Sequence, residues 1–112
     1  PYYKVTERFP IDVNIGVLAR MKTVVGMRLH SLMFAAGKGV PVVGISYDVK
    51  VDNFLKYIAS SNCIPLTALT AELLIPAIGD CATGRYDADV RRTAEMLLTR
   101  EAENIRAVRA LM

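Results

Sequence analysis

The spacing of apolar residues along the chain predicts helices that alternate with short strands. After Pro10, whose fixed φ suits the first turn of a helix, apolar residues recur at helical spacing and predict a helix over about residues 11–21. Residues 23–26 are mostly β-branched and end in a glycine, which predicts a buried strand. Apolar residues from Leu29 onward predict a second helix, closed by the glycines at 37 and 39.

The alternation continues through the rest of the chain. Residues 40–46 are apolar on both faces, as in a strand that helices cover on each side of a parallel sheet. The elements predicted after it are a helix that includes 52–58, a strand at 62–66, a helix from the N-cap Thr70 through Ile78, and an amphipathic helix over about 87–112. Pro76 is expected to bend or shorten its helix. The mixed charges of the last helix predict a solvated face.

This order of elements predicts an α/β fold with three layers, in which a mostly parallel sheet of three or four strands has helices on both faces. A chain of 112 residues can form one core but not two lobes that enclose a cleft, so we expect residues 1–112 to be a single domain. The first strand would lie inside the sheet of a larger protein. We therefore expect a sheet edge that missing chain or a neighbouring molecule completes, which would also allow a homo-oligomer.

Composition and charge exclude several classes of protein. The chain is 53% hydrophobic and 22% charged, which argues against disorder, and its apolar runs are far shorter than the ~20 residues of a membrane-spanning helix. A net charge of +3 without a basic run argues against a nucleic-acid partner. The chain begins with neither an initiator Met nor the pattern of a signal peptide, so we expect a fragment of a cytoplasmic protein, with attachment to the inner face of the membrane as the alternative.

The two cysteines and the single histidine do not form a metal-binding pattern. Cys63 and Cys81 lie far apart without CxxC spacing, and His30 is the only imidazole. We expect no metal site and interpret both cysteines as buried thiols, with a disulfide as the alternative.

The first segment that could carry chemistry is residues 26–31, where a predicted strand passes into a helix. Ligands of such sheets collect outside the carboxyl ends of the strands, and a helix N-terminus there favours a phosphate or carboxylate. Arg28 could hold either anion through two hydrogen bonds, and His30 could transfer a proton near neutral pH. The alternative is structural: Arg28 would bind a neighbouring carbonyl group and His30 would be half-buried.

A second polar segment, residues 46–50, follows the next apolar strand, so both segments should open on one edge of the sheet. In a functional interpretation, Lys50 adds a cation beside Arg28 while Tyr47 and Asp48 hydrogen-bond to a hydroxylated substrate. In the alternative, Asp48 caps the following helix and Lys50 is a surface residue. Lys38 lies at the far end of its helix and is assigned to the surface.

These two segments resemble the C-terminal domain of the polysaccharide pyruvyl transferase family. The likeness is carried by VGMRLHSL at 25–32, FAA at 34–36, GVPVVGISYD at 39–48, and Lys50, in order over about residues 25–57. The combination of the RLH element with the downstream GISYD-x-K element is more specific than either alone. Val49 stands where the family usually has proline, which affects loop rigidity more than chemistry.

The resemblance implies a two-lobed, GT-B-like enzyme with a partial Rossmann-like C-terminal domain, of which residues 1–112 would be a fragment without the N-terminal lobe. Such an enzyme moves a pyruvyl group from phosphoenolpyruvate onto two hydroxyls of a sugar or lipid-linked saccharide in bacterial cell-wall, capsular or exopolysaccharide synthesis. It implies no cofactor. His30 would be catalytic as a general acid and base, with binding of the phosphate as the alternative. The substrate-binding residues would be Arg28, Ser31, Tyr47, Asp48 and Lys50.

Two other functions remain open at this point. A GT-B glycosyltransferase or a sugar-nucleotide epimerase binds a nucleotide diphosphate with similar strand-to-helix turns, and a non-catalytic binding module would retain the fold alone. As an isolated chain, we expect no turnover, because the donor side lacks its opposing wall.

Overall fold

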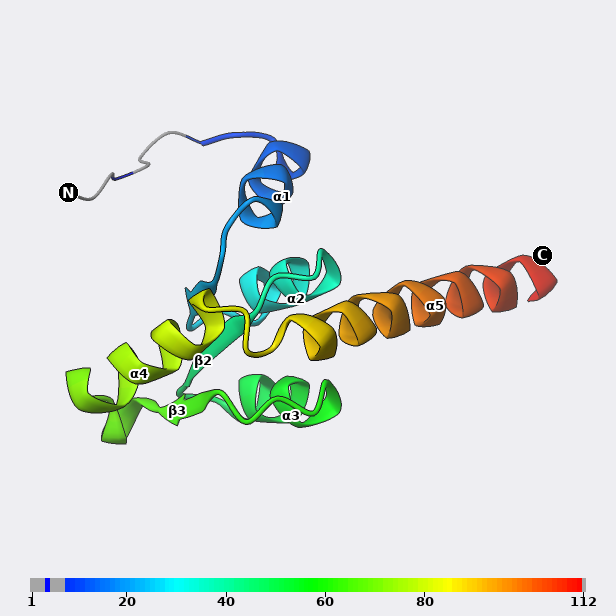
Figure 1. Ribbon diagram of the computed structural model, residues 1–112. Coiled ribbons are helices and arrows are strands. Elements are labelled where there is room, and N and C mark those ends of the chain that lie inside the picture. The colour runs from blue at the N-terminus through cyan, green and yellow to red at the C-terminus, as the bar shows by residue number, and fades with distance from the viewer. Residues whose placement is uncertain (1–3, 5–7, 112) are drawn as a thin grey trace.

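The computed structural model describes Lys4 and residues 8–111, which form a small parallel sheet surrounded by helices (Figure 1). The elements are α1 (Ile11–Ala19), β1 (Val24–Gly26), α2 (Leu29–Gly37), β2 (Val42–Ser46), α3 (Val49–Tyr57), β3 (Cys63–Pro65), the 3₁₀ turn η1 (Leu66–Ala68), α4 (Ala71–Ala82) and α5 (Asp87–Leu111). The predicted alternation of helices and strands is confirmed.

The three strands pair in the order β1-β2-β3, and both pairs are parallel. Val24 lies opposite Val42, and Gly44 lies opposite Cys63. Every residue of β2 is buried, as expected of the central strand of a covered sheet. The predicted α/β class with a parallel sheet is confirmed. β1 is an edge strand of three residues.

Helices cover both faces of the sheet, which is compatible with the predicted three layers. α2 and α3 lie on one face and α4 lies on the other (Figure 1). The core on the first face consists of Val24, Leu32, Ala35, Val40, Val42, Val51 and Leu55. The smaller core on the second face consists of Val43, Ile64 and Cys81. Alternate residues of β2 therefore serve different cores, as the two-residue repeat of a strand requires.

Gly44 is needed where β2 passes beneath α2 and α3. A Cβ atom there would overlap the Leu55 Cδ1 methyl and lie 3.3 Å from Val51 Cγ1 and 3.4 Å from Leu32 Cδ1. These three side chains are almost completely buried, so none of them can move aside into solvent. The missing side chain lets both helices pack closely onto the strand.

The end of α4 differs from the prediction. The helix runs through Pro76 to Ala82, so the predicted end at Ile78 and the predicted shortening by the proline are wrong. The cause is tertiary: Cys81, in the last turn, is 2% exposed and packs into the second core, which stabilises the helix beyond the proline. Thr70 occupies the N-cap position as predicted, but its side chain makes no capping hydrogen bond.

The two cysteines have different environments. Both are free, so the alternative of a disulfide is wrong. Cys81 is buried as predicted, and burial raises the pKa of its thiol. Cys63 is only half-buried, which corrects the prediction for that residue: its thiol lies beside α3 at the start of an edge strand.

α5 confirms the predicted long helix and is the most extended element. Its first part packs against α2, and the rest projects away from the sheet (Figure 1). Leu98, Ile105 and Val108 are 67%, 49% and 58% exposed. In the part of the chain that the structure describes, no helix combines the length and the apolar character needed to cross a membrane.

Candidate functional site

The two polar segments lie at the same edge of the sheet, as the sequence predicted. β1 ends at Gly26 and β2 ends at Ser46, and the two strands are parallel with Gly26 opposite Gly44. Each strand passes through a two-residue loop into the next helix. The helices α2 and α3 therefore both begin at the carboxyl edge of the sheet, with Arg28 and Asp48 as their N-cap residues.

Arg28 lies at the junction between β1 and α2. Its backbone is extended, with φ −97° and ψ 132°, and its side chain is exposed. Its carbonyl oxygen accepts hydrogen bonds from the Ser31 hydroxyl at 2.8 Å and from the Leu32 N–H at 3.4 Å. These bonds hold the backbone of the first turn of α2, while the guanidinium group stays in solvent.

Gly26 makes this tight turn possible. A Cβ atom at residue 26 would lie 2.8 Å from Ser31 Oγ and 3.1 Å from Leu32 Cδ2. Leu32 is fully buried, so the helix cannot move outward without disturbing the core. The missing side chain of Gly26 thus allows the first turn of α2 to pack closely against the end of β1.

His30 lies on the first turn of α2 and is exposed. Its ring centroid is 6.2 Å from that of Phe34, one turn further along, and the two rings are tilted by 49°. The contact with Phe34 limits the directions in which the imidazole can point, and its exposure leaves the ring nitrogens accessible. The alternative interpretation of a half-buried histidine is wrong.

The N-termini of α2 and α3 differ in one respect that matters for binding. The Asp48 carboxylate accepts a hydrogen bond from the Lys50 backbone N–H at 3.1 Å, so α3 is capped by its own chain. Among the described residues, no side chain caps α2 in this way. The first N–H groups of a helix have no partner within the helix, so those of α2 remain free to bind an anion.

The remaining predicted residues lie around the start of α3. Tyr47 is 60% exposed and Lys50 is exposed, so neither side chain is held by the core. Asp48 acts as the helix cap, which is the structural alternative that the sequence left open. The Ser31 hydroxyl donates its hydrogen to the Arg28 carbonyl but keeps its lone pairs for a further partner.

A polar cluster of Ser46, Asp52 and Cys63 was missed by the sequence analysis. The buried Ser46 hydroxyl lies within reach of the Asp48 carbonyl oxygen, at 3.3 Å, and of the Asp52 carboxylate, and can donate to either. The Cys63 thiol donates to Asp52 Oδ1 at 3.3 Å. Hydrogen bonds from Ser46 and then Cys63 lower the pKa of Asp52, whereas burial and then the Asp52 carboxylate raise the pKa of Cys63.

The cluster ties β2, α3 and β3 together directly behind the second candidate segment. Its signal in the sequence is the position of Asp52 six residues after Ser46, which places a carboxylate one turn into the helix that follows the strand. The raised pKa favours the protonated form of the Cys63 thiol, which is the less nucleophilic one.

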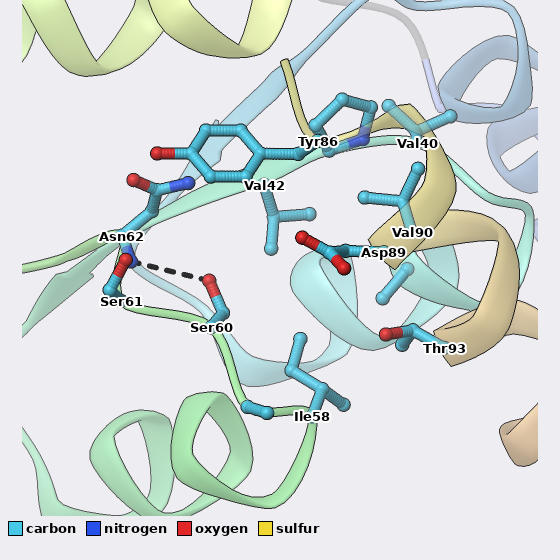
Figure 2. A pocket seen from close by; sticks show the side chains of 13 residues that line it. Val40, Val42, Ile58, Ser60, Ser61, Asn62, Tyr86, Asp89, Val90 and Thr93 are labelled. Atoms are coloured by element: carbon cyan, nitrogen blue, oxygen red, sulfur yellow. Dashed lines mark hydrogen bonds between the residues drawn. The ribbon is translucent and has the colours of Figure 1, made fainter. Parts of the chain in front are cut away.

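A cavity of about 140 Å³ lies at the other end of the sheet (Figure 2). Its wall includes Val40 just before β2, Val42 at the start of β2, the loop before β3, and the first turns of α5. Figure 2 shows Tyr86 and Asn62 on one side and Asp89 and Thr93 on another. None of the predicted site residues, all of which are described, lines this cavity. The described residues also contain no group of three or more acidic, histidine or cysteine side chains that could hold a metal ion.

Comparison with known proteins supports the family predicted from the sequence. Residues 6–49 match the sequence model of the family described as "Polysaccharide pyruvyl transferase", so this part of the chain is similar to that family. The matched segment runs through β1, α2 and β2 and ends at Val49, so it contains Arg28, His30 and Asp48. Neither the comparison with curated proteins nor that with solved structures gave a match.

Proposed function

We propose that this chain forms the donor-binding side of an enzyme that transfers a pyruvyl group from phosphoenolpyruvate to two hydroxyls of a saccharide, producing a cyclic ketal. The observation that carries the proposal is the N-terminus of α2. It lacks a side-chain cap among the described residues, has an exposed arginine at its N-cap, and lies inside the segment that matches the pyruvyl transferase family. The complete enzyme would be two-lobed and GT-B-like, with the acceptor site on the other lobe.

The donor carries a carboxylate and a phosphate on a three-carbon frame, and the start of α2 suits such an anion. The free N–H groups and the positive end of the helix dipole attract one anionic group, and the guanidinium of Arg28 can bind the same group or its neighbour through two hydrogen bonds. Lys50, on the first turn of the adjacent α3, supplies a second cation at this edge of the sheet. The cap made by Asp48 keeps the anion away from α3 itself.

The reaction requires proton transfers that His30 can perform. The methylene carbon of the donor accepts a proton, one sugar hydroxyl adds to the neighbouring carbon, and the second hydroxyl displaces the phosphate. One hydroxyl proton thus ends on the new methyl group and the other leaves with the phosphate. His30 acts as the group that takes and returns these protons, since it lies two residues from Arg28 and is accessible to solvent and ligand.

The test uses the protein with its natural upstream region, the variants Arg28→Ala and His30→Ala, and Lys38→Ala as a control at the other end of α2. Calorimetry should show phosphoenolpyruvate binding weakened by about ten- to a hundredfold in Arg28→Ala, because a charge-assisted pair is lost. His30→Ala should bind the donor nearly as well but turn over ~10²- to 10⁴-fold more slowly. Lys38→Ala should behave as the parent in both assays.

Near-normal pyruvylation by His30→Ala would contradict its catalytic role, and unchanged donor affinity in Arg28→Ala would contradict the binding site. The same titrations with UDP-sugars distinguish this proposal from a glycosyltransferase or epimerase. Binding of a UDP-sugar that depends on Arg28, without binding of phosphoenolpyruvate, would overturn the proposed donor.

A further inference from the structure

The projecting half of α5 carries an apolar stripe that nothing in the described chain covers. Leu98, Ile105 and Val108 are 67%, 49% and 58% exposed, although α5 is helical to its last described residue. Earlier on the helix, Val90 and Ala94 face the end of α2, where Ala94 Cβ lies 4.0 Å from the position of a Cβ on Gly39. At about 100° per residue, the exposed stripe continues the line of these docked residues.

A helix in this state needs a partner. Isolated helices shorter than ~12–15 residues are marginal in water, because most helical stability comes from packing of an apolar face. The half of α5 beyond Leu97 has about that length and no tertiary support in the described structure (Figure 1). Its stripe therefore has the properties of an interface rather than of a solvated surface.

The charges beside the stripe indicate which partner fits. Glu101 and Arg109 lie about 40° to either side of Ile105, one turn before and one turn after it. In an antiparallel pair of α5 helices in which Ile105 faces the partner's Ile105, Glu101 lies level with the partner's Arg109 along the helix axis. By symmetry, Arg109 lies level with the partner's Glu101. Two opposite-charge pairs then flank the apolar contact. A parallel pair would instead place like charges at the same heights.

We infer that the projecting half of α5 is a homodimer interface, in which two copies of the chain pair as antiparallel helices centred on Ile105. The arrangement is self-complementary, as a two-fold interface must be. It places the two sheets at opposite ends of the helix pair, so the bodies of the two copies do not collide. The paired segment from Leu98 to Leu111 is only about 20 Å long, so the dimer is weak and forms in roughly the micromolar to hundred-micromolar range.

The experiment is a charge-reversal series measured by sedimentation velocity on the 112-residue chain over about 10 to 500 µM. Glu101→Arg and Arg109→Glu each create two like-charge pairs in the dimer, so each variant should raise the dissociation constant at least about tenfold. An equimolar mixture of the two variants restores both opposite-charge pairs, and it should dimerise about as well as the parent. The matched controls Glu103→Arg and Arg100→Glu make the same charge changes on the far side of the helix and should leave association unchanged.

Three results would overturn the inference. The first is a parent chain that stays monomeric at the highest concentration. The second is dimerisation of the single variants with the affinity of the parent, which would place the contact elsewhere, for example at the edge of β1. The third is a mixture of variants that associates no better than either alone, which would exclude the antiparallel register. Far-UV circular dichroism of each variant shows that α5 is retained.

Discussion

Replacing Gly26 by alanine should weaken the start of α2 and destabilise the protein. The new Cβ would lie 2.8 Å from Ser31 Oγ, which forces a shift, and 3.1 Å from Leu32 Cδ2, which is tighter than ordinary packing. If the Ser31 side chain rotates away, its hydrogen bond to the Arg28 carbonyl is lost, which costs about 0.5–1.5 kcal/mol. Crowding of the buried Leu32 costs a further ~1–3 kcal/mol.

These costs are partly offset, because alanine restricts the unfolded chain more than glycine does, by about 0.4–1 kcal/mol. We therefore expect a net loss of roughly 1–3 kcal/mol in the free energy of unfolding, which corresponds to a fall in Tm of about 4 °C or more. Urea and thermal unfolding followed by circular dichroism at the helix band measure both quantities.

Gly37→Ala is the matched control, since it makes the same substitution at the C-terminal end of α2, whereas Gly26 lies just before the start of α2. No atom outside the immediate neighbourhood lies within 4 Å of the new Cβ, so this variant should be as stable as the parent or up to ~1 kcal/mol more stable. The variant Gly26→Ala/Ser31→Ala should lose less than the sum of its single changes, because the crowded hydroxyl is gone. Equal stability of Gly26→Ala and Gly37→Ala would refute the reasoning.

Two further predictions concern the core and the polar cluster. Gly44→Ala should destabilise the protein by about 1–3 kcal/mol, because the new Cβ overlaps the buried Leu55 side chain. An unchanged midpoint of urea unfolding would contradict the packing described for β2. The pKa of the Asp52 carboxyl is lower in the folded protein than in the unfolded chain. The ionised carboxylate therefore stabilises the fold at pH values above the ordinary pKa of about 4, and this stabilisation is lost as the pH falls through the lowered pKa of the folded protein. Asp52→Asn should therefore be less stable than the parent near pH 7, with the difference shrinking below about pH 4; a difference independent of pH would show that the carboxylate charge is not involved.

Much of the fold follows from local spacing, since helical and strand periodicity repeat within a few residues. The apolar residues of 42–46 predict a covered central strand, and parallel pairing then places Arg28 and Asp48 at one edge. The end of α4 could not be predicted in this way. It depends on the contact of Cys81 with strands that lie tens of residues earlier in the chain.

The candidate site was predictable as a location and less so in its contacts. The sequence named Asp48 both as a substrate ligand and as a helix cap, and only the hydrogen bond to the Lys50 N–H shows which role it has in this structure. The contact of Asp52 with Cys63 depends on the register between β2 and β3, which spacing along the chain does not reveal. The exposure of His30 depends likewise on which side of α2 packs onto the sheet.

The strands lie side by side in the sheet in the same order in which they follow one another along the chain. A polypeptide leaves the ribosome from its N-terminus, so β1, α2 and β2 are complete before β3 and α4 have been made, and each later strand adds beside one already in place. The Val43 side of the central strand is the last to be sheltered, because its cover comes from α4. The architecture can thus assemble in the direction of synthesis, with one apolar face left open until α4 has been made.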